Sequence, residues 1–286
     1  MIVVLGAAGQ LGTAFMRRLP HATALTRSEL DLAHATPEDV ADVLAGARIV
    51  INCAAYTAVD RAESEEGIAT AVNGTAVGRL AEVTATMGVP FVTFSTDYVF
   101  AGTGTRPYLE SDPTDPVNAY GRSKLAGERA ALAANPRCLV IRTSWVVSGT
   151  HPNFIATMLR LAGDGKALRV VDDQQGRPTM VDDLAPATLD ALAEDVTGVL
   201  HLTNQGETTW YTFARAALAE AGLDVELISP CTTAEYPTAA VRPAYSVLGS
   251  EVVERVGLTP LPPWHESLPN VVEGLRTSGV VASPSR

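Results

Sequence analysis

A tyrosine and a lysine lie four residues apart in the segment AYGRSKLAGE, residues 119–128. The segment reads as the first turns of a helix, where positions i and i+4 share a face, so Tyr120 and Lys124 should lie side by side. The chain holds 21 lysines and arginines together, and only two of them, Lys124 and Lys166, are lysines. A nearby cation lowers the pKa of a phenol from about 10. The pair therefore predicts a tyrosine that protonates a carbonyl oxygen while a hydride reaches the carbonyl carbon.

Hydroxyl side chains end an apolar run that predicts a buried strand, PFVTFST at residues 90–96. Ser95 and Thr96 close this run, and Asp97 follows them. Ligands of open α/β sheets bind outside the carboxyl ends of the strands, so a hydroxyl at this position can donate a hydrogen bond to a substrate carbonyl. The alternative is that Ser95 and Thr96 only cap the backbone where the strand ends.

Three glycines, Gly6, Gly9 and Gly12, come at the end of and directly after the first apolar run, MIVVLG at residues 1–6. A dinucleotide pyrophosphate needs backbone N–H groups at a helix N-terminus with no side chain in the way. The GxxGxxG spacing alone also fits a tight turn without a ligand. Its position between an expected strand and an expected helix favours dinucleotide binding.

The end of the second expected strand bears on the choice of cofactor. An acidic residue there would bind the ribose 2′-hydroxyl of NADH. This chain has LTRSEL, in which Thr26, Arg27 and Ser28 precede Glu29. Arg27 can neutralise a 2′-phosphate, so NADPH is the expected cofactor and NADH the other possibility. The alternative for Arg27 is a solvated loop arginine.

Apolar runs alternate with helical patterns over residues 1–147. Strands are expected at 1–6, 22–26, 47–55, 90–96 and 138–147, and helices at 9–19, 36–46, 73–88 and 120–134. Buried strands that alternate with helices are typical of a parallel sheet covered on both faces. The predicted fold class is α/β, a Rossmann-type doubly wound parallel sheet with a smaller C-terminal α/β substrate-binding lobe.

The second half of the chain is less regular. Helices are expected at 153–165, 180–193 and 210–222, a strand that runs into a loop at 168–179, a strand at 198–204, and a last short helix after 258–268. Residues 1–147 are assigned to the dinucleotide-binding domain, to which 180–204 return. Residues 148–179 and 205–275 are assigned to the substrate-binding lobe, and 279–286 to a disordered tail.

Composition excludes several classes of function. A net charge of −11 and a pI near 4.9 argue against a nucleic-acid surface, which needs a basic patch. No apolar run is long enough for a membrane span, and the start of the chain lacks the pattern of a secretory signal. Three widely spaced cysteines without a C-x-x-C pair indicate a reducing compartment. We therefore expect a cytoplasmic protein without nucleic-acid or membrane partners.

The motifs together resemble the extended short-chain dehydrogenase/reductases, and within them the dTDP-4-dehydrorhamnose reductase family. The resemblance covers about residues 1–270. It is carried by GAAGQLG (6–12), NCAAYTAVDRAE (52–63), STDYVFAG (95–102), YGRSKLAGE (120–128), RTSWV (142–146), NF (153–154), VVDDQQGRPT (170–179) and RPAYSVL (242–248).

The resemblance implies the reduction of the C4 ketone of dTDP-4-dehydro-L-rhamnose by NAD(P)H, and it implies roles for individual residues. Tyr120 would donate the proton, Lys124 would tune it and hold the cofactor ribose, Thr96 would polarise the ketone, and Asp97 would contact the sugar. For the cofactor, the glycine turn, the second strand and the resemblance together indicate Gly6, Gly9, Gln10, Leu11, Arg27, Asp31, Leu32, Ala54, Ala55, Tyr56, Tyr120 and Lys124.

The same resemblance implies two further substrate contacts. Trp145 would pack on the sugar or hydrogen-bond to it, or else be a core aromatic at a strand end. The Gln174–Thr179 loop and Arg242 are candidates for the nucleotide half. A guanidinium binds phosphate oxygens bidentately, so Arg242 is the stronger candidate for the diphosphate, with a structural loop arginine as the alternative.

Metal binding and assembly are the points at which the chain departs from the resemblance. Some relatives hold Mg²⁺ between subunits through glutamates, including one early in the first helix, where this chain has Ala14. No metal is predicted, and the assembly is expected to be a monomer or a homodimer.

Four alternative functions belong to proteins that share the fold or part of these motifs. A 4,6-dehydratase would carry a glutamate where this chain has Tyr98, and the STDYVF signature disfavours a 4-epimerase. A reductase of another dTDP-4-keto-deoxysugar would keep every motif and change only pocket residues. A non-catalytic NADP-binding regulatory subunit would have no need of Tyr120 and Lys124.

Overall fold

The structure is a computed structural model, and it describes residues 1–281. Most of the tail predicted to be disordered, residues 282–286, therefore lies outside the described residues. In the rest of the chain every peptide bond is trans.

Six parallel strands form the central sheet. They are β1 (Ile2–Leu5), β2 (Thr23–Leu25), β3 (Ile49–Asn52), β4 (Phe91–Thr96), β5 (Cys138–Thr143) and β10 (Gly198–His201), in the order β2-β1-β3-β4-β5-β10. Strand β2 pairs with one side of β1 and β3 with the other, so the winding reverses there and a crevice opens beyond the carboxyl ends of these strands. The sheet confirms the predicted doubly wound α/β class.

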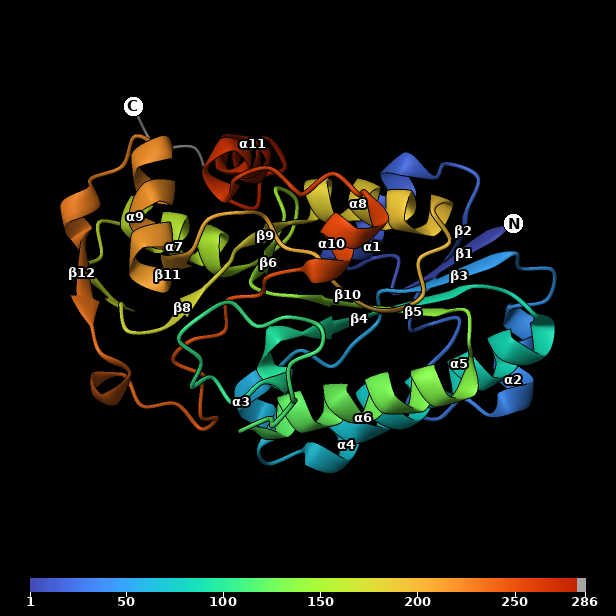
Figure 1. The fold of residues 1–286 in the computed structure, drawn as a ribbon. Coiled ribbons are helices and arrows are strands. Elements are labelled where there is room, and N and C mark those ends of the chain that lie inside the picture. Colours follow the sequence, from blue (N-terminus) through green and yellow to red (C-terminus); the bar gives the residue numbers. More distant parts are fainter. Residues whose placement is uncertain (282–286) are drawn as a thin grey trace.

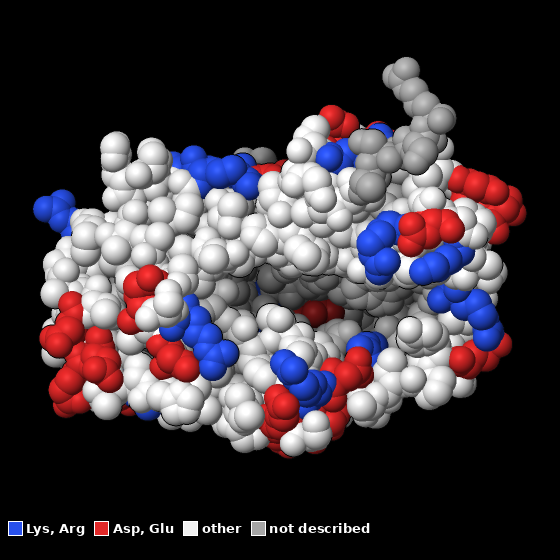
Figure 2. Space-filling model, turned by 180° about the vertical axis from the view of Figure 1, so that it is seen from behind, with Lys and Arg blue, Asp and Glu red and all other residues white. Residues whose placement is uncertain are grey.

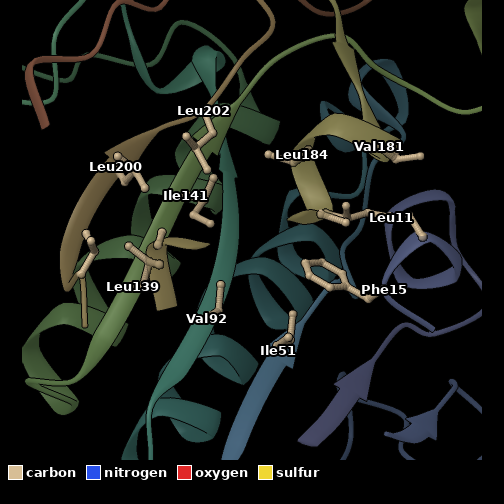
Figure 3. Close-up of a cluster of buried hydrophobic side chains, with 14 of the residues drawn as sticks. Leu11, Phe15, Ile51, Val92, Leu139, Ile141, Val181, Leu184, Leu200 and Leu202 are labelled. Carbon is tan, nitrogen blue, oxygen red and sulfur yellow. The ribbon is translucent and has the colours of Figure 1, made fainter. Parts of the chain in front are cut away.

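Helices cover both faces of the sheet, as Figure 1 shows. α1 (Gln10–Arg18) and α8 (Val181–Ala193) pack together on one face, whereas α2 (Pro37–Val43), α5 (Ala76–Met87) and α6 (Ala119–Ala134) cover the other. Strands β1, β3, β4, β5 and β10 send alternate apolar side chains into the two layers. Figure 3 shows the layer under α1 and α8, where Phe15, Ile51, Val92, Ile141 and Leu184 are fully buried.

A second core lies in the smaller lobe, which the chain enters three residues after β5. α7 (Phe154–Gly163), α9 (Trp210–Glu220) and α11 (Trp264–Thr277) bury Ile155, Phe213 and Leu275 within it. Three two-stranded pairs complete the lobe: β6 (Val146–Val147) with β9 (Thr179–Met180), β7 (Leu168–Val171) with β12 (Ile228–Cys231), and β8 (Gln175–Gly176) with β11 (Thr208–Thr209).

The predicted division of the chain needs a correction at α10 (Glu251–Val256). Residues 205–275 were assigned to the lobe, but Val252, Val253 and Leu261 pack into the core of the sheet beside α8. The chain thus returns to the sheet a second time, because the apolar face of α10 lies against β10. The other boundaries between the two parts stay predictions.

The helix predicted at 73–88 begins earlier and changes its winding. After the short α3 (Val59–Ala62), α4 (Glu66–Thr70) leads into a π-helix, Ala71–Thr75, and α5 continues from it. The helix ends at Gly88 in the left-handed conformation (φ 69°), as predicted. Asn73 and Gly74 are buried in the π-helical turn.

Three other elements differ from the predictions. The strand expected at 138–147 is interrupted at Trp145, whose φ of 46° cannot continue a strand, so β5 and β6 are separate. Strand β12 was not predicted, because ISPC has only two apolar side chains and a proline. The last helix, expected to be short, has 14 residues and contains Pro269.

Candidate active site

A cavity of about 540 Å³ opens at the point where the winding of the sheet reverses. Figure 2 shows a hollow on the face of the molecule opposite to that of Figure 1, with basic and acidic side chains around it. The cavity volume lies within the range of small-molecule and cofactor sites. Of the residues predicted to bind the cofactor, those that line it are Gly6, Gly9, Arg27, Asp31, Leu32, Ala54, Ala55 and Tyr56.

The glycine turn brings backbone against backbone beside this cavity. Gly6 has a φ of 69°, and a Cβ on it would lie 2.6 Å from the backbone nitrogen of Ala54. A Cβ on Gly12 would lie 2.2 Å from the carbonyl oxygen of Gly6. In the described structure no side chain caps the N-terminus of α1, and its first turn holds no acidic residue. The turn therefore fits a pyrophosphate, whose oxygens accept from helix N–H groups.

We expect Gly12→Ala to open this turn. Its methyl group would meet backbone atoms that cannot move aside, so the affinity for NADPH should fall about ten-fold or more and the free energy of unfolding by about 1–3 kcal/mol. Fluorescence titration with NADPH and urea unfolding measure the two effects. Gly163→Ala in α7 is the matched control, because a Cβ there meets nothing within 4 Å. An unchanged NADPH affinity in Gly12→Ala would contradict the assignment of the turn.

The far end of the cavity holds the side chains that bear on the cofactor's 2′ position. Arg27 is 83% exposed and forms an ion pair of 3.2 Å with Asp31. Next to it, the Glu29 carboxylate accepts hydrogen bonds from the backbone N–H and the hydroxyl of Thr26 and from the Ser28 hydroxyl, and these bonds lower its pKa. Arg27 can therefore turn to a 2′-phosphate by leaving only an exposed ion pair, which is a weak contact.

Gln10 and Leu11 are oriented away from the cavity lining. The side-chain carbonyl of Gln10 accepts hydrogen bonds from Ser148 (3.0 Å) and Asn153 (3.2 Å), and Leu11 packs into the core under α1. A ring nitrogen of His151 also lies 3.0 Å from the carbonyl oxygen of Ala8. Gln10 thus joins the glycine turn to the start of α7, and Leu11 has only its backbone to offer a cofactor.

The start of α6 is fixed from three sides. Asn118 caps the helix by accepting from the N–H of Gly121 at 2.8 Å, and it donates to the carbonyl of Val241. The N–H of Ala119 donates to Glu63 at 2.8 Å. Gly121 permits close packing, because a Cβ there would lie 2.2 Å from the carbonyl oxygen of Tyr98. These contacts set the position of Tyr120, which lies between Ala119 and Gly121.

Tyr120 and Lys124 lie one turn apart on α6, as the spacing predicts. Tyr120 is half-buried, and its ring packs edge-on against Tyr98 with 6.1 Å between the centroids. Lys124 is only 5% exposed. Neither residue lines the 540 Å³ cavity; both belong to the helix next to it.

The pKa of Tyr120 differs from the sequence-based expectation. Burial and then the negative charge of Asp97 raise it above the usual value of a phenol, and a hydrogen bond with Thr96 opposes this. Burial also lowers the pKa of Lys124 to about 8, against the opposing charge of Glu128. The predicted lowering of the tyrosine pKa is thus wrong for the ligand-free chain, because desolvation of the phenolate and the charge of Asp97 raise this pKa, and Lys124 is not among the groups that shift it.

Thr96 and Asp97 lie at the carboxyl end of β4, close to Tyr120. The Thr96 hydroxyl donates to Asp97 at 3.0 Å and accepts from the N–H of Tyr98 at 3.2 Å, so it does cap the backbone here. Burial raises the pKa of Asp97 to about 7. Its second carboxylate oxygen and the Ser95 hydroxyl are buried without a hydrogen-bond partner among residues 1–281. Unsatisfied buried groups of this kind suit a polar ligand.

Trp145 and Arg242 already have partners within the chain. The indole of Trp145 stacks on that of Trp210 with 3.6 Å between the ring centroids, and Gly176 lies against the Trp145 ring. Arg242 forms a bidentate ion pair with Asp60, with distances of 2.7 and 3.0 Å. Neither contact excludes a ligand: Trp145 remains half-buried, and the Asp60 carboxylate is partly exposed.

Sequence reasoning missed several residues that hold the site together. Asn73 accepts from the N–H of Tyr56, and donates to the carbonyl of Tyr56 and to Ser123 on α6. Glu128 and Arg142 form a buried ion pair behind Lys124. A polar residue on an apolar helix face was the available signal for Asn73, and the four-residue spacing from Lys124 was the signal for Glu128. The sequence held no signal for Asp60, because its partner Arg242 is 182 residues away.

Neither a metal cluster nor a membrane-spanning helix is found in the described part of the chain. Within residues 1–281, no three or more histidine, cysteine, aspartate or glutamate side chains gather as a metal ion would need. None of the helices in that range has the length and the apolar character needed to cross a membrane.

Comparisons with known proteins agree with this geometry. Residues 1–277 match the family model of the RmlD substrate binding domain. A dTDP-4-dehydrorhamnose reductase of Burkholderia thailandensis is 44% identical, covering 92% of this chain and 95% of that protein. A probable dTDP-4,6-dihydroxy-2-methyloxan-3-one 4-ketoreductase of Streptomyces antibioticus is 41% identical, covering 93% and 92%.

A solved structure is similarly close. The crystal structure of a dTDP-4-dehydrorhamnose reductase from Bacillus anthracis, in complex with NADP, superposes with a TM-score of 0.91. It is 33% identical, and the superposition covers 94% of this chain and 97% of that one.

Proposed function

We propose, from the premise that this chain belongs to the RmlD substrate binding domain family, that it is an NAD(P)H-dependent dTDP-4-dehydrorhamnose reductase. It reduces the C4 ketone of dTDP-4-dehydro-L-rhamnose to the alcohol of dTDP-L-rhamnose, the last step of dTDP-rhamnose biosynthesis. The cofactor is NADPH, as in the related crystal structure, with NADH as the second possibility.

One observation carries the proposal. The phenol of Tyr120, the buried Lys124 and the strand-end hydroxyl of Thr96 lie together beside a cavity with a glycine turn of the kind that binds dinucleotides. Reduction of a ketone needs a hydride donor in the cavity and a proton donor at the carbonyl oxygen. Tyr120 meets the second need because a phenol carries its proton at neutral pH and can give it to an oxygen on which negative charge develops.

The side chains of the site have separate tasks in this reaction. When bound, NADPH supplies the hydride that the carbonyl carbon accepts. Tyr120 gives its proton to the carbonyl oxygen as negative charge develops there, and Thr96 donates a hydrogen bond to the same oxygen. Lys124 binds the cofactor ribose and stabilises the phenolate that remains. Asp97 orients the sugar through the carboxylate oxygen that has no partner in the described chain.

The nucleotide half of the substrate would bind on the lobe side. Arg242 would exchange the Asp60 carboxylate for the diphosphate, since both offer paired oxygens to the guanidinium. Trp145, held flat by Trp210, would pack against the sugar with its remaining surface.

The test is NADPH oxidation with dTDP-4-dehydro-L-rhamnose generated in place. The expected result is loss of NADPH absorbance together with formation of dTDP-L-rhamnose, identified by chromatography and mass spectrometry. If the folded protein binds NADPH but leaves this substrate unchanged, the proposal fails for this sugar.

A second candidate is a reductase of another dTDP-4-keto-deoxysugar. The Streptomyces antibioticus relative favours it, because a protein so named is 41% identical to this chain. The two candidates share their catalytic chemistry, so the relative kcat/KM values for the two keto-sugars decide between them.

Arg242→Gln is expected to weaken substrate binding selectively. Hydrogen bonds to charged groups contribute about 1.5–3 kcal/mol, so KM for the dTDP-sugar should rise about ten-fold to a hundred-fold while kcat changes little. Steady-state kinetics at saturating NADPH measure both. Arg106→Gln is the matched control, because Arg106 forms a similar bidentate pair with Asp112 on the surface. Equal KM values in the two variants would remove Arg242 from the diphosphate site.

Location and assembly belong to the proposal as well. The enzyme is placed in the cytoplasm, on the support of three free cysteines far apart in the sequence. Its assembly is a monomer or a homodimer, which sedimentation velocity would distinguish.

A further inference from the structure

The carboxylate of Glu128 lies four residues beyond Lys124 on α6, just as Lys124 lies four residues beyond Tyr120. Side chains at this spacing follow one another along a single face of a helix. Glu128 is 3% exposed and Lys124 is 5% exposed. This face of α6 therefore carries a phenol, an ammonium and a carboxylate in succession, the last two almost wholly removed from water.

Arg142 on β5 holds the Glu128 carboxylate in a buried, bidentate ion pair. Its Nη2 lies 2.7 Å from Glu128 Oε2, and its Nε lies 3.0 Å from Oε1. The guanidinium is itself fixed, 5.1 Å from the ring centre of Phe100 and 3.4 Å from Nε2 of His201.

The charge of this carboxylate favours the protonated form of Lys124. It forms none of the ion pairs found among residues 1–281, so no carboxylate touches it directly. Burial favours the neutral amine, and Glu128 is the charge that opposes this effect. Since the opposing charge sits one helical turn away, its contribution is electrostatic and does not need a hydrogen bond.

Stability alone gives little reason for a buried pair at this position. Two well-packed apolar side chains usually stabilise a fold as much as a buried ion pair does, or more. The pair lies directly behind a lysine that the reaction needs in its charged form, in a chain with only one other lysine.

We propose that Glu128 is a positioning residue of the reduction, whose carboxylate, fixed by Arg142, keeps Lys124 charged beside Tyr120. This inference rests on the proposed function only for its effect on turnover; the charge state of Lys124 can be measured without substrate. Glu128 takes part in no chemical step of the reduction.

Several groups could influence Lys124 besides Glu128, and the test has to separate them. Tyr120 lies on the same helix, Asp97 and Tyr98 lie in the 3-10 turn beneath it, and Asp60 lies on α3. Three further groups near α6 already have partners: Glu63 accepts from the N–H of Ala119, Glu66 pairs with Arg122, and His201 contacts Arg142 and the carbonyl of Gly249. The other charged side chains are Arg129 on α6 and Arg79 and Glu82 on α5, which packs against it.

The small number of lysines makes a direct measurement possible. Protein labelled with ¹³C at the lysine side chains should give two Cε signals, and Lys166→Arg assigns them. Titration of each signal reports the charge of that lysine. Lys166, 58% exposed, is the internal reference for an ordinary lysine.

Removing Glu128 and removing Arg142 should shift the midpoint of the Lys124 titration in opposite directions. In Glu128→Gln the Arg142 charge is left unopposed, so the midpoint of the Lys124 titration should move to lower pH by about one unit or more. In Arg142→Met the carboxylate is left unopposed, and the midpoint should move to higher pH. Glu66→Gln removes the exposed partner of Arg122 on the same helix and should leave the midpoint unchanged.

The pH dependence of kcat should shift in each variant in the same direction as the midpoint of the Lys124 titration. The alkaline limb of the kcat profile should shift to lower pH in Glu128→Gln and recover toward the wild type when the assay pH is lowered. A merely structural role for Glu128 would lower kcat at every pH alike.

A Lys124 midpoint in Glu128→Gln within about half a pH unit of the wild type would overturn the inference. If that variant does not fold, Glu128→Gln with Arg142→Met replaces both charges by neutral groups, and its midpoint should lie below that of the wild type. An unchanged midpoint in this double variant also overturns the inference. Failure of the wild type to reduce the keto-sugar would contradict the proposed function instead, while the titration would stand.

Discussion

Tyr120→Phe is expected to lower kcat about 10²-fold to 10⁴-fold while the protein keeps its fold and its affinity for NADPH. The substitution removes one hydroxyl from a half-buried ring and leaves its edge-on contact with Tyr98 in place. The loss should therefore fall on the chemical step, and KM for the keto-sugar should change little.

Stopped-flow measurement of NADPH oxidation under single-turnover conditions isolates that step. Tyr236→Phe is the matched control, because Tyr236 is 56% exposed and is not one of the residues assigned to the site. A Tyr120→Phe enzyme with more than about a tenth of the wild-type rate would mean that a different group donates the proton.

Lys124→Met should change activity and stability in opposite directions. Turnover should fall about 100-fold or more, because the phenolate left on Tyr120 loses its neighbouring cation. Folding lowers the pKa of Lys124 from 10.5 to about 8, so the buried charge costs up to about 3 kcal/mol at neutral pH. An apolar side chain of similar length avoids this cost, and the free energy of unfolding should rise.

The gain in the free energy of unfolding that we expect for Lys124→Met depends on pH. Below pH 8 the lysine is charged in both states, and the cost of burying it is fully present. Between pH 8 and 10.5 the unfolded chain binds more protons than the folded one, so this contribution favours folding increasingly as the pH rises. The advantage of Lys124→Met should therefore shrink across that interval.

Urea unfolding at a series of pH values measures the effect. Lys166→Met is the control, because its side chain is exposed and should leave both turnover and stability near the wild type. A Lys124→Met protein that is less stable than the wild type at neutral pH would contradict the assigned burial cost.

Much of the fold could be predicted from the sequence, because the strands of a doubly wound sheet are buried on both faces. Runs such as IVVL and IVIN are apolar at every position or nearly so, and they stand out against the helices between them. Where an element owes its existence to a distant partner, prediction failed. β12 is a strand because it pairs with β7, and its own letters, with a proline in third place, do not require one.

The residues of the site also differ in how far they could be predicted, depending on whether their contacts are local or distant in the sequence. Tyr120 and Lys124 could be predicted as a pair because local helix geometry brings them together. The pKa of Tyr120 could not, since its sign depends on burial by tertiary packing and on Asp97, which approaches from another element. The contact of Arg242 with Asp60 likewise forms only when residues from opposite ends of the sequence meet.

The π-helix Ala71–Thr75 has a consequence for how chains of this family can differ in length. A π-helical turn contains one residue more than an α-helical turn. Deleting that residue would restore a regular helix from α4 into α5, and the buried faces on both sides of it would keep their orientation. Deleting a residue elsewhere in α5 would instead rotate the following part of the helix by about 100° and expose its core face. Among relatives, a one-residue gap should therefore be tolerated at this turn and avoided further along the helix. Relatives with the gap would lose the place of Asn73, which ties the Tyr56 segment to α6.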